Sequence, residues 1–83
     1  MKINKKDIVE IVSNLLDISL KSIENIDENE NLMNLGMSSI SCIKLVVLLE
    51  EKYNFVLKDE DLLIEKLNTI SKLVKIIERY LNT

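Results

Sequence analysis

Residues 35–40 read Leu35-Gly36-Met37-Ser38-Ser39-Ile40, and they lead directly into a strongly apolar helical pattern that ends near Tyr53. Gly36 is the only glycine among the 83 residues. Because glycine adopts backbone conformations that other residues resist, its position predicts a sharp turn just before the helix. Ser38 is suited to cap this helix, and Ser39 then stands at its first turn with its hydroxyl exposed.

Successive residues of a helix are about 100° apart around its axis, and this spacing places the apolar residues of the helix predicted over residues 39–53 in two stripes. One stripe is expected to face the core; its members are Cys42, Leu45, Val46, Leu49 and Tyr53. The other lies on the flank of Ser39 and consists of Ile40, Ile43 and Val47, bordered by Lys44, Glu50 and Glu51. A small apolar patch with a charged rim suits transient docking of a partner, although in a small bundle both stripes could also be buried.

The remaining pattern predicts an all-α fold. A first helix follows the N-cap Asn4 and ends near Leu16, and a last helix follows Asn68 or Thr69 and ends near Leu81. A short helix is expected from Lys58 to about residue 66, and a long first loop over residues 17–38. We therefore expect one domain, residues 1–83, built as a small four-helix bundle with three longer helices, one short helix and a long first loop.

Composition excludes several kinds of site and partner. The chain has no histidine and one cysteine, so a Ser-His-Asp triad, a Cys-His pair and histidine- or thiolate-based metal sites are impossible. The acidic cluster in the first loop lacks the spacing of a calcium loop, and we interpret it as a solvated surface; it consists of Glu24, Asp27, Glu28 and Glu30. A net charge of −3 argues against nucleic acid. With no signal peptide and no apolar run of membrane-spanning length, we expect a cytoplasmic monomer that binds neither membrane nor metal.

At this point the chain resembles the acyl and peptidyl carrier protein family over nearly its whole length. The motifs that carry the resemblance are Asn34-Leu35-Gly36-Met37-Ser38-Ser39-Ile40, Lys44-Leu45, Leu49-Glu50-Glu51-Lys52-Tyr53, and Thr69-Ile70 followed by Leu73. The resemblance implies that Ser39 receives a 4′-phosphopantetheine arm from coenzyme A, with Gly36, Met37 and Ser38 forming the cofactor-binding surroundings. The arm's thiol would hold an acyl or aminoacyl cargo as a thioester. The implied partners are a phosphopantetheinyl transferase, a cargo-loading ligase or acyltransferase, and downstream synthase or transferase enzymes.

Two departures from the family pattern bear on the pathway. Ser38 stands where the family usually has an aspartate that assists the transferase. Ser41 and Lys44 occupy positions that are commonly acidic in bacterial fatty-acid carriers. Because partners with a basic patch would find a weaker complement here, we favour a specialised thiotemplated pathway, of the polyketide or nonribosomal peptide kind. A fatty-acid or D-alanyl carrier is the alternative. The lack of a linker at either end favours a free-standing protein.

Two further hypotheses belong to other classes of protein. The chain could be an unmodified helical interaction module that docks through the Ile40, Ile43 and Val47 patch. It could also be a small enzyme that uses Cys42, or Ser41 with Lys44, although Cys42 falls on the expected core stripe and has no histidine partner. We expect a carrier and not an enzyme.

Overall fold

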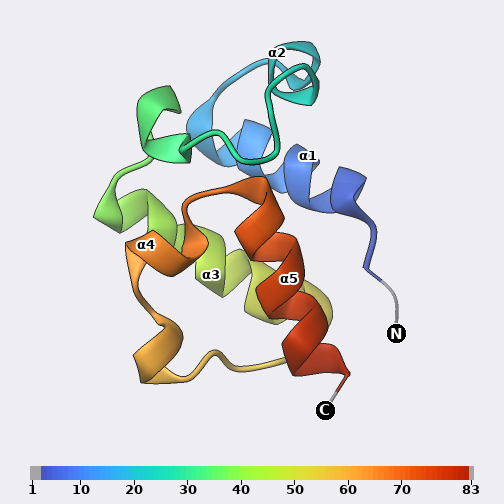
Figure 1. Cartoon of the computed structure of the whole chain (residues 1–83), viewed down its shortest axis with the longest axis vertical. Coiled ribbons are helices and arrows are strands. Elements are labelled where there is room, and N and C mark those ends of the chain that lie inside the picture. Colours follow the sequence, from blue (N-terminus) through green and yellow to red (C-terminus); the bar gives the residue numbers. More distant parts are fainter. Residues whose placement is uncertain (1–2, 83) are drawn as a thin grey trace.

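The computed structural model describes residues 3–82, and helices are the regular structure that it contains there, with no strand. Five α-helices and two short 3₁₀ turns follow one another along the chain (Figure 1). Their bounds are α1 Lys5–Leu16, α2 Leu20–Glu24, η1 Leu32–Leu35, α3 Ser39–Tyr53, η2 Asp59–Asp61, α4 Ile64–Leu67 and α5 Ile70–Leu81. The prediction of a small all-α bundle with three long helices is confirmed.

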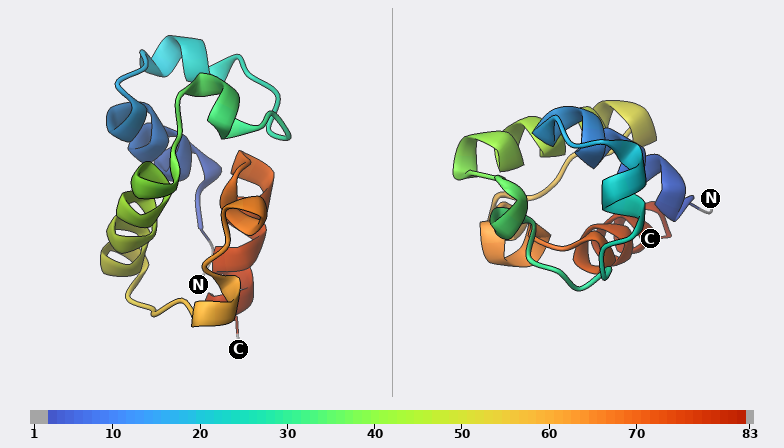
Figure 2. Two further views of the ribbon diagram at one scale, coloured as in Figure 1. Left: turned by 90° about the vertical axis from the view of Figure 1, so that its left-hand side faces the viewer. Right: turned by 90° about the horizontal axis from the view of Figure 1, so that it is seen from above.

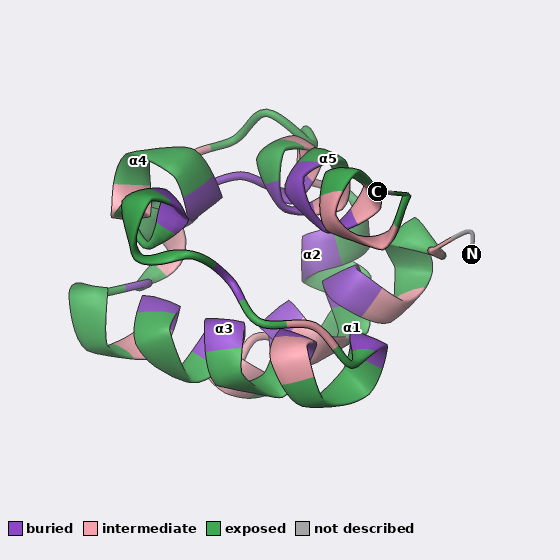
Figure 3. Cartoon of the chain, turned by 90° about the horizontal axis from the view of Figure 1, so that it is seen from below, coloured by how far each residue is buried: buried purple, intermediate pink, exposed green. Residues whose placement is uncertain are grey.

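The core lies between the three long helices. α1 contacts both α3 and α5, and α4 fills the remaining side against α3 and α5. Ile8 on α1, Leu45 on α3 and Leu73 on α5 are fully buried. Figure 3 shows the buried positions of the helices turned toward this common centre. Their burial follows from the apolar repeat of about 3.6 residues, which places one face of each helix on the core.

Each long helix begins at a side-chain cap. Asn4 accepts a hydrogen bond from the Lys6 N–H, Ser38 accepts one from the Ser41 N–H, and Thr69 accepts one from the Lys72 N–H. These side chains satisfy N–H groups that have no partner inside the helix. The predicted caps Asn4 and Ser38 are confirmed, and Thr69 rather than Asn68 caps α5.

The long first connection is more ordered than we predicted. It contains α2 and η1, which bury Ile23 and Leu32 and cross one end of the bundle (Figure 2, left). Two backbone hydrogen bonds join it to the end of α4 and the start of α5: the Leu32 N–H donates to the Asn68 carbonyl at 2.7 Å, and the Ser71 N–H donates to the Glu28 carbonyl at 2.9 Å. The weak periodicity of residues 17–38 hid this order, because single helical turns are too short to show a repeat.

The prediction of one short helix from Lys58 to residue 66 was wrong, because this segment is not one continuous helix. The chain makes the turn η2, leaves helical geometry at Leu62 and Leu63, and resumes as α4. Asp61 is turned inward and is only 7% exposed, whereas Leu62 and Leu63 are 41% and 44% exposed. A continuous helix is therefore broken by a buried carboxylate whose partners lie on α4 and α5.

The described residues form neither a membrane-spanning helix nor a metal-binding cluster. Over residues 3–82, no helix is both long enough and apolar enough to span a bilayer. In the same part of the chain, no group of three or more acidic, histidine or cysteine side chains is arranged to hold a metal ion. The acidic residue Glu28 instead forms an exposed ion pair with Lys5, 2.7 Å between Nζ and Oε2.

Candidate functional site

Gly36 makes the turn that brings the chain from η1 into α3. Its φ of +102° lies in the left-handed region, which side chains other than glycine's disfavour. The Gly36 N–H donates to the Met33 carbonyl at 3.2 Å, and the Met37 N–H donates to the Leu32 carbonyl at 3.1 Å. A Cβ added at Gly36 would meet no atom within 4 Å, so backbone conformation and not space requires glycine here.

Met37 and Ser38 have structural roles between this turn and the helix. Met37 was predicted among the residues surrounding the cofactor, but its side chain is buried in the core and 3% exposed. It anchors the turn to the core, and its side chain cannot line a site on the surface. Ser38 has extended backbone geometry, and its Oγ accepts the Ser41 N–H at 3.1 Å, so it supplies the helix cap.

Ser39 is the first residue of α3, and its side chain is exposed. Within residues 3–82 its hydroxyl has no hydrogen-bond partner. The first N–H groups of a helix and the helix dipole together favour a negatively charged group nearby. The position therefore presents an accessible hydroxyl in a setting that favours a phosphodiester.

An apolar groove of about 320 Å³ opens beside Ser39. One wall comes from α3 and the other from α4 and the residues just before it. The lining residues are Ser39, Cys42, Ile43, Val46, Leu62, Leu63, Ile64 and Leu67. Sequence reasoning missed the second wall, because Leu62 and Leu63 were assigned to a helix whose faces could not be oriented. The groove is what an apolar group attached at Ser39 would meet first.

The stripe predicted for docking is exposed on the structure. Ile40, Ile43 and Val47 are 69%, 62% and 45% exposed, whereas the five residues of the other stripe are buried as predicted. A shallow hollow of about 360 Å³ extends this surface toward α1. Four of its lining residues were predicted for docking: Ile43, Lys44, Val47 and Glu51. The other two, Leu15 and Leu48, were not predicted from the sequence. Leu48 lies one turn after Lys44, a spacing that could have revealed it.

Glu50 does not belong with the charged rim. It was predicted there with Glu51, but it is half-buried, and its Oε2 accepts the Leu57 N–H at 2.8 Å. The carboxylate binds the loop after α3 and is therefore not available to a docking partner. Glu51 and Lys44 are exposed and remain on the predicted surface.

Cys42 is 5% exposed, and burial raises the pKa of its thiol above the usual value. A raised pKa leaves little thiolate at neutral pH, which does not favour a nucleophile. The structure thus supports the prediction that Cys42 is a core residue rather than a catalytic one.

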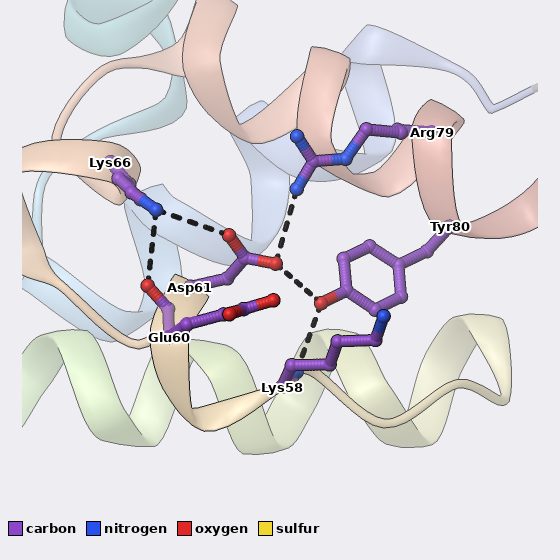
Figure 4. Close-up of a pocket in the computed structure, with 6 residues that line it drawn as sticks. All are labelled: Lys58, Glu60, Asp61, Lys66, Arg79 and Tyr80. Atoms are coloured by element: carbon purple, nitrogen blue, oxygen red, sulfur yellow. Dashed lines mark hydrogen bonds and ion pairs between the residues drawn. The ribbon is translucent and has the colours of Figure 1, made fainter.

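A second, polar hollow of about 460 Å³ lies on the other side of η2 and α4, between them and α5 (Figure 4). Its centre is the Asp61 carboxylate, which accepts hydrogen bonds from Tyr80 and Arg79 and faces Lys66. The Tyr80 hydrogen bond, with the two cations, lowers the pKa of Asp61 below its ordinary value. Because the Asp61 carboxylate already pairs with Lys66 and Arg79, this hollow is filled by an ion network of the chain's own side chains.

The helical bundle and the exposed serine after the left-handed turn are what a helical carrier protein would need, and comparison with known proteins shows the family. Residues 6–77 match the family described as "Phosphopantetheine attachment site". A similar curated protein is an acyl carrier protein of Wolinella succinogenes, 33% identical over 72 residues, which are 87% of this chain and 90% of that protein. The chain belongs to the phosphopantetheine-binding carrier family.

Family membership establishes a carrier with a covalently attached 4′-phosphopantetheine, and not a catalyst. The residues around α3 fit such a group. The Ser39 hydroxyl is exposed, the helix N-terminus suits a phosphodiester, and the adjacent groove is apolar.

Proposed function

We propose that Ser39 is the attachment site of the arm. The observation that carries the proposal is the position of its hydroxyl: exposed, without a hydrogen-bond partner among residues 3–82, and immediately after the Gly36 turn and the Ser38 cap. Ser38 is the competing serine. Its Oγ already accepts the Ser41 N–H and lies 3.1 Å from the Ser41 Oγ, so modification there would remove the helix cap.

A pair of serine variants tests this assignment. Fluorescent coenzyme A and a broad-specificity phosphopantetheinyl transferase would label the wild type and Ser38→Ala, while Ser39→Ala would stay folded and unlabelled. Circular dichroism provides the control for folding. Labelled Ser39→Ala together with unlabelled Ser38→Ala would move the site to Ser38.

We further propose that the chain delivers acyl or aminoacyl cargo through a docking surface on α3, which consists of Ile40, Ile43, Lys44, Val47 and Glu51. The arm's terminal thiol would carry the cargo as a thioester. Three exposed aliphatic side chains beside the attachment site support apolar docking. The exposed charges of the surface are one of each sign, since Glu50 is committed to the Leu57 N–H.

This balance of charge supports a specialised thiotemplated pathway, of the polyketide or nonribosomal peptide kind. An enzyme that recognises an acidic carrier helix with a basic patch would gain little from Lys44 and Glu51 together. The alternative is fatty-acid synthesis, in keeping with the similar protein's name, acyl carrier protein. The proposed partners are a phosphopantetheinyl transferase, a loading ligase or acyltransferase, and a downstream synthase.

Malonyl transfer separates the two pathways. A malonyltransferase of fatty-acid synthesis would load an acidic-helix control carrier well and this chain poorly. Lys44→Glu with Ser41→Asp would raise loading of this chain. Wild-type loading equal to that of the control would instead favour the fatty-acid alternative.

A further inference from the structure

Leu62 and Leu63 form part of the groove beside Ser39, yet core packing does not hold them. Both are more than two-fifths exposed, and neither belongs to the core or to the apolar residues packed against it. They lie in a two-residue arch between η2 and α4, outside helical geometry. Ile64 and Leu67, the rest of this wall, pack against or within the core, so other contacts must help to position Leu62 and Leu63 themselves.

Lys66 ties the two ends of the arch together. Its Nζ donates to the Glu60 carbonyl at 3.0 Å and to Asp61 Oδ1 at 3.3 Å. The Lys66 N–H also donates to the Leu63 carbonyl at 2.8 Å. One lysine on α4 thus holds the last residues of η2, and the arch between them is short.

Asp61 and Tyr80 tie the same arch to α5. The Tyr80 hydroxyl donates to Asp61 Oδ2 at 2.6 Å and accepts the Lys58 N–H at 2.9 Å. Arg79 donates to the same carboxylate oxygen at 3.1 Å. Figure 4 shows Tyr80, Arg79 and Lys66 converging on Asp61 from two helices. Because Asp61 directly precedes Leu62, these hydrogen bonds restrain the chain where the wall begins.

We propose that Asp61 and Tyr80 are positioning residues for the groove, which hold Leu62 and Leu63 against α3 and so set how well an alkyl cargo on the Ser39 arm is covered. This inference rests on the proposed attachment at Ser39. The occupant is an alkyl chain because the groove is lined by aliphatic side chains and one buried thiol, with Ser39 itself at its edge. Asp61 and Tyr80 do not line the groove, so they act through the arch.

The first test measures the wall without any arm. In the unmodified chain, Tyr80→Phe removes one hydroxyl and keeps the ring, and Asp61→Asn removes the charge. Both variants should shift the NMR methyl signals of Leu62 and Leu63 more than those of the core residue Leu45. The control is Ser13→Ala, which removes a buried hydroxyl that donates to the Glu10 carbonyl on α1 and should leave the wall signals unchanged. Unchanged Leu62 and Leu63 signals in both test variants would overturn the proposal.

The second test measures cover of the cargo. The transferase would attach octanoyl-phosphopantetheine from octanoyl-coenzyme A, and mass spectrometry would follow hydrolysis of the octanoyl thioester. Hydrolysis in Tyr80→Phe should be faster than in the wild type and in Ser13→Ala by about two- to tenfold, the range that one net hydrogen bond represents. Equal rates would refute the role in covering cargo. Failure to modify Ser39 would contradict the proposed function, and the methyl signals would still decide the position of the wall.

Discussion

The Tyr80 hydroxyl on α5 lies 2.6 Å from the Asp61 carboxylate in η2, and this hydrogen bond joins segments 19 residues apart. Tyr80 also packs against Phe55, with ring centroids 5.4 Å apart. One side chain thus holds both the beginning and the end of the connection from α3 to α4. That connection ends at the wall of the groove beside Ser39.

The interactions of Asp61 make the stability of the fold depend on pH. The Tyr80 hydrogen bond, with Lys66 and Arg79, lowers the pKa of Asp61 below its ordinary value of about 3.8. A carboxyl group whose folded-state pKa is lowered stabilises the fold above its unfolded pKa, and this contribution disappears as the pH falls toward the folded-state pKa. Wild type should therefore melt above Asp61→Asn at pH 6, and the difference in Tm should shrink as the pH falls through about 4, where unfolded Asp is close to half protonated. A Tm difference that is constant between pH 6 and pH 2.5 would contradict this account.

Gly36→Ala should lower the free energy of unfolding by about 1–2 kcal/mol, because alanine resists the left-handed region. Space is available for the methyl group, so the loss would come from the backbone alone. Gly36→Asn should lose less, since asparagine enters this region more readily. Urea unfolding measures all three proteins, and an alanine variant as stable as the wild type would show that the turn does not depend on glycine.

Ser38→Asp should both stabilise α3 and speed attachment of the arm. Aspartate can keep the hydrogen bond to the Ser41 N–H and adds a negative charge at the helix N-terminus, which is worth about 0.3–1 kcal/mol. By the family resemblance it also restores the residue that assists the transferase. Thermal melting and the rate of coenzyme A consumption test the two effects. A slower rate despite a higher Tm would show that the transferase in the assay prefers serine at position 38.

Two variants on α3 separate the docking surface from the core. Val47→Asp should leave stability nearly unchanged, because Val47 is 45% exposed, but should weaken transfer from a loading enzyme. Leu45→Ala, at a fully buried position, should cost about 2–5 kcal/mol of stability. Urea unfolding and a transfer assay under native conditions distinguish them. Unchanged transfer by Val47→Asp would remove this surface from docking.

The local sequence pattern was enough to predict α3, its cap and the turn before it. The separation of buried Leu45 from exposed Val47 follows from the helical repeat, and the capping role of Ser38 follows from its residue type and position. Gly36 was informative because the chain uses glycine once. These features depend on residues within one or two turns of each other.

Longer-range contacts were beyond reach of the sequence. The commitment of Glu50 depends on a backbone N–H seven residues later, at Leu57. The break between η2 and α4 depends on Asp61 finding partners on α5, 18 and 19 residues away. Burial of Met37 depends on the packing of the turn against the core. In each case the tertiary partner decides the outcome, and no local repeat encodes it.

The measurement that tests the central claim most directly is the intact mass of the wild-type chain before and after incubation with coenzyme A and a broad-specificity phosphopantetheinyl transferase, followed by peptide mapping. The account predicts a gain of one phosphopantetheinyl group, mapped to Ser39. No gain, with a control carrier fully modified in the same reaction, would contradict the assignment of Ser39 as a site that such an enzyme can use.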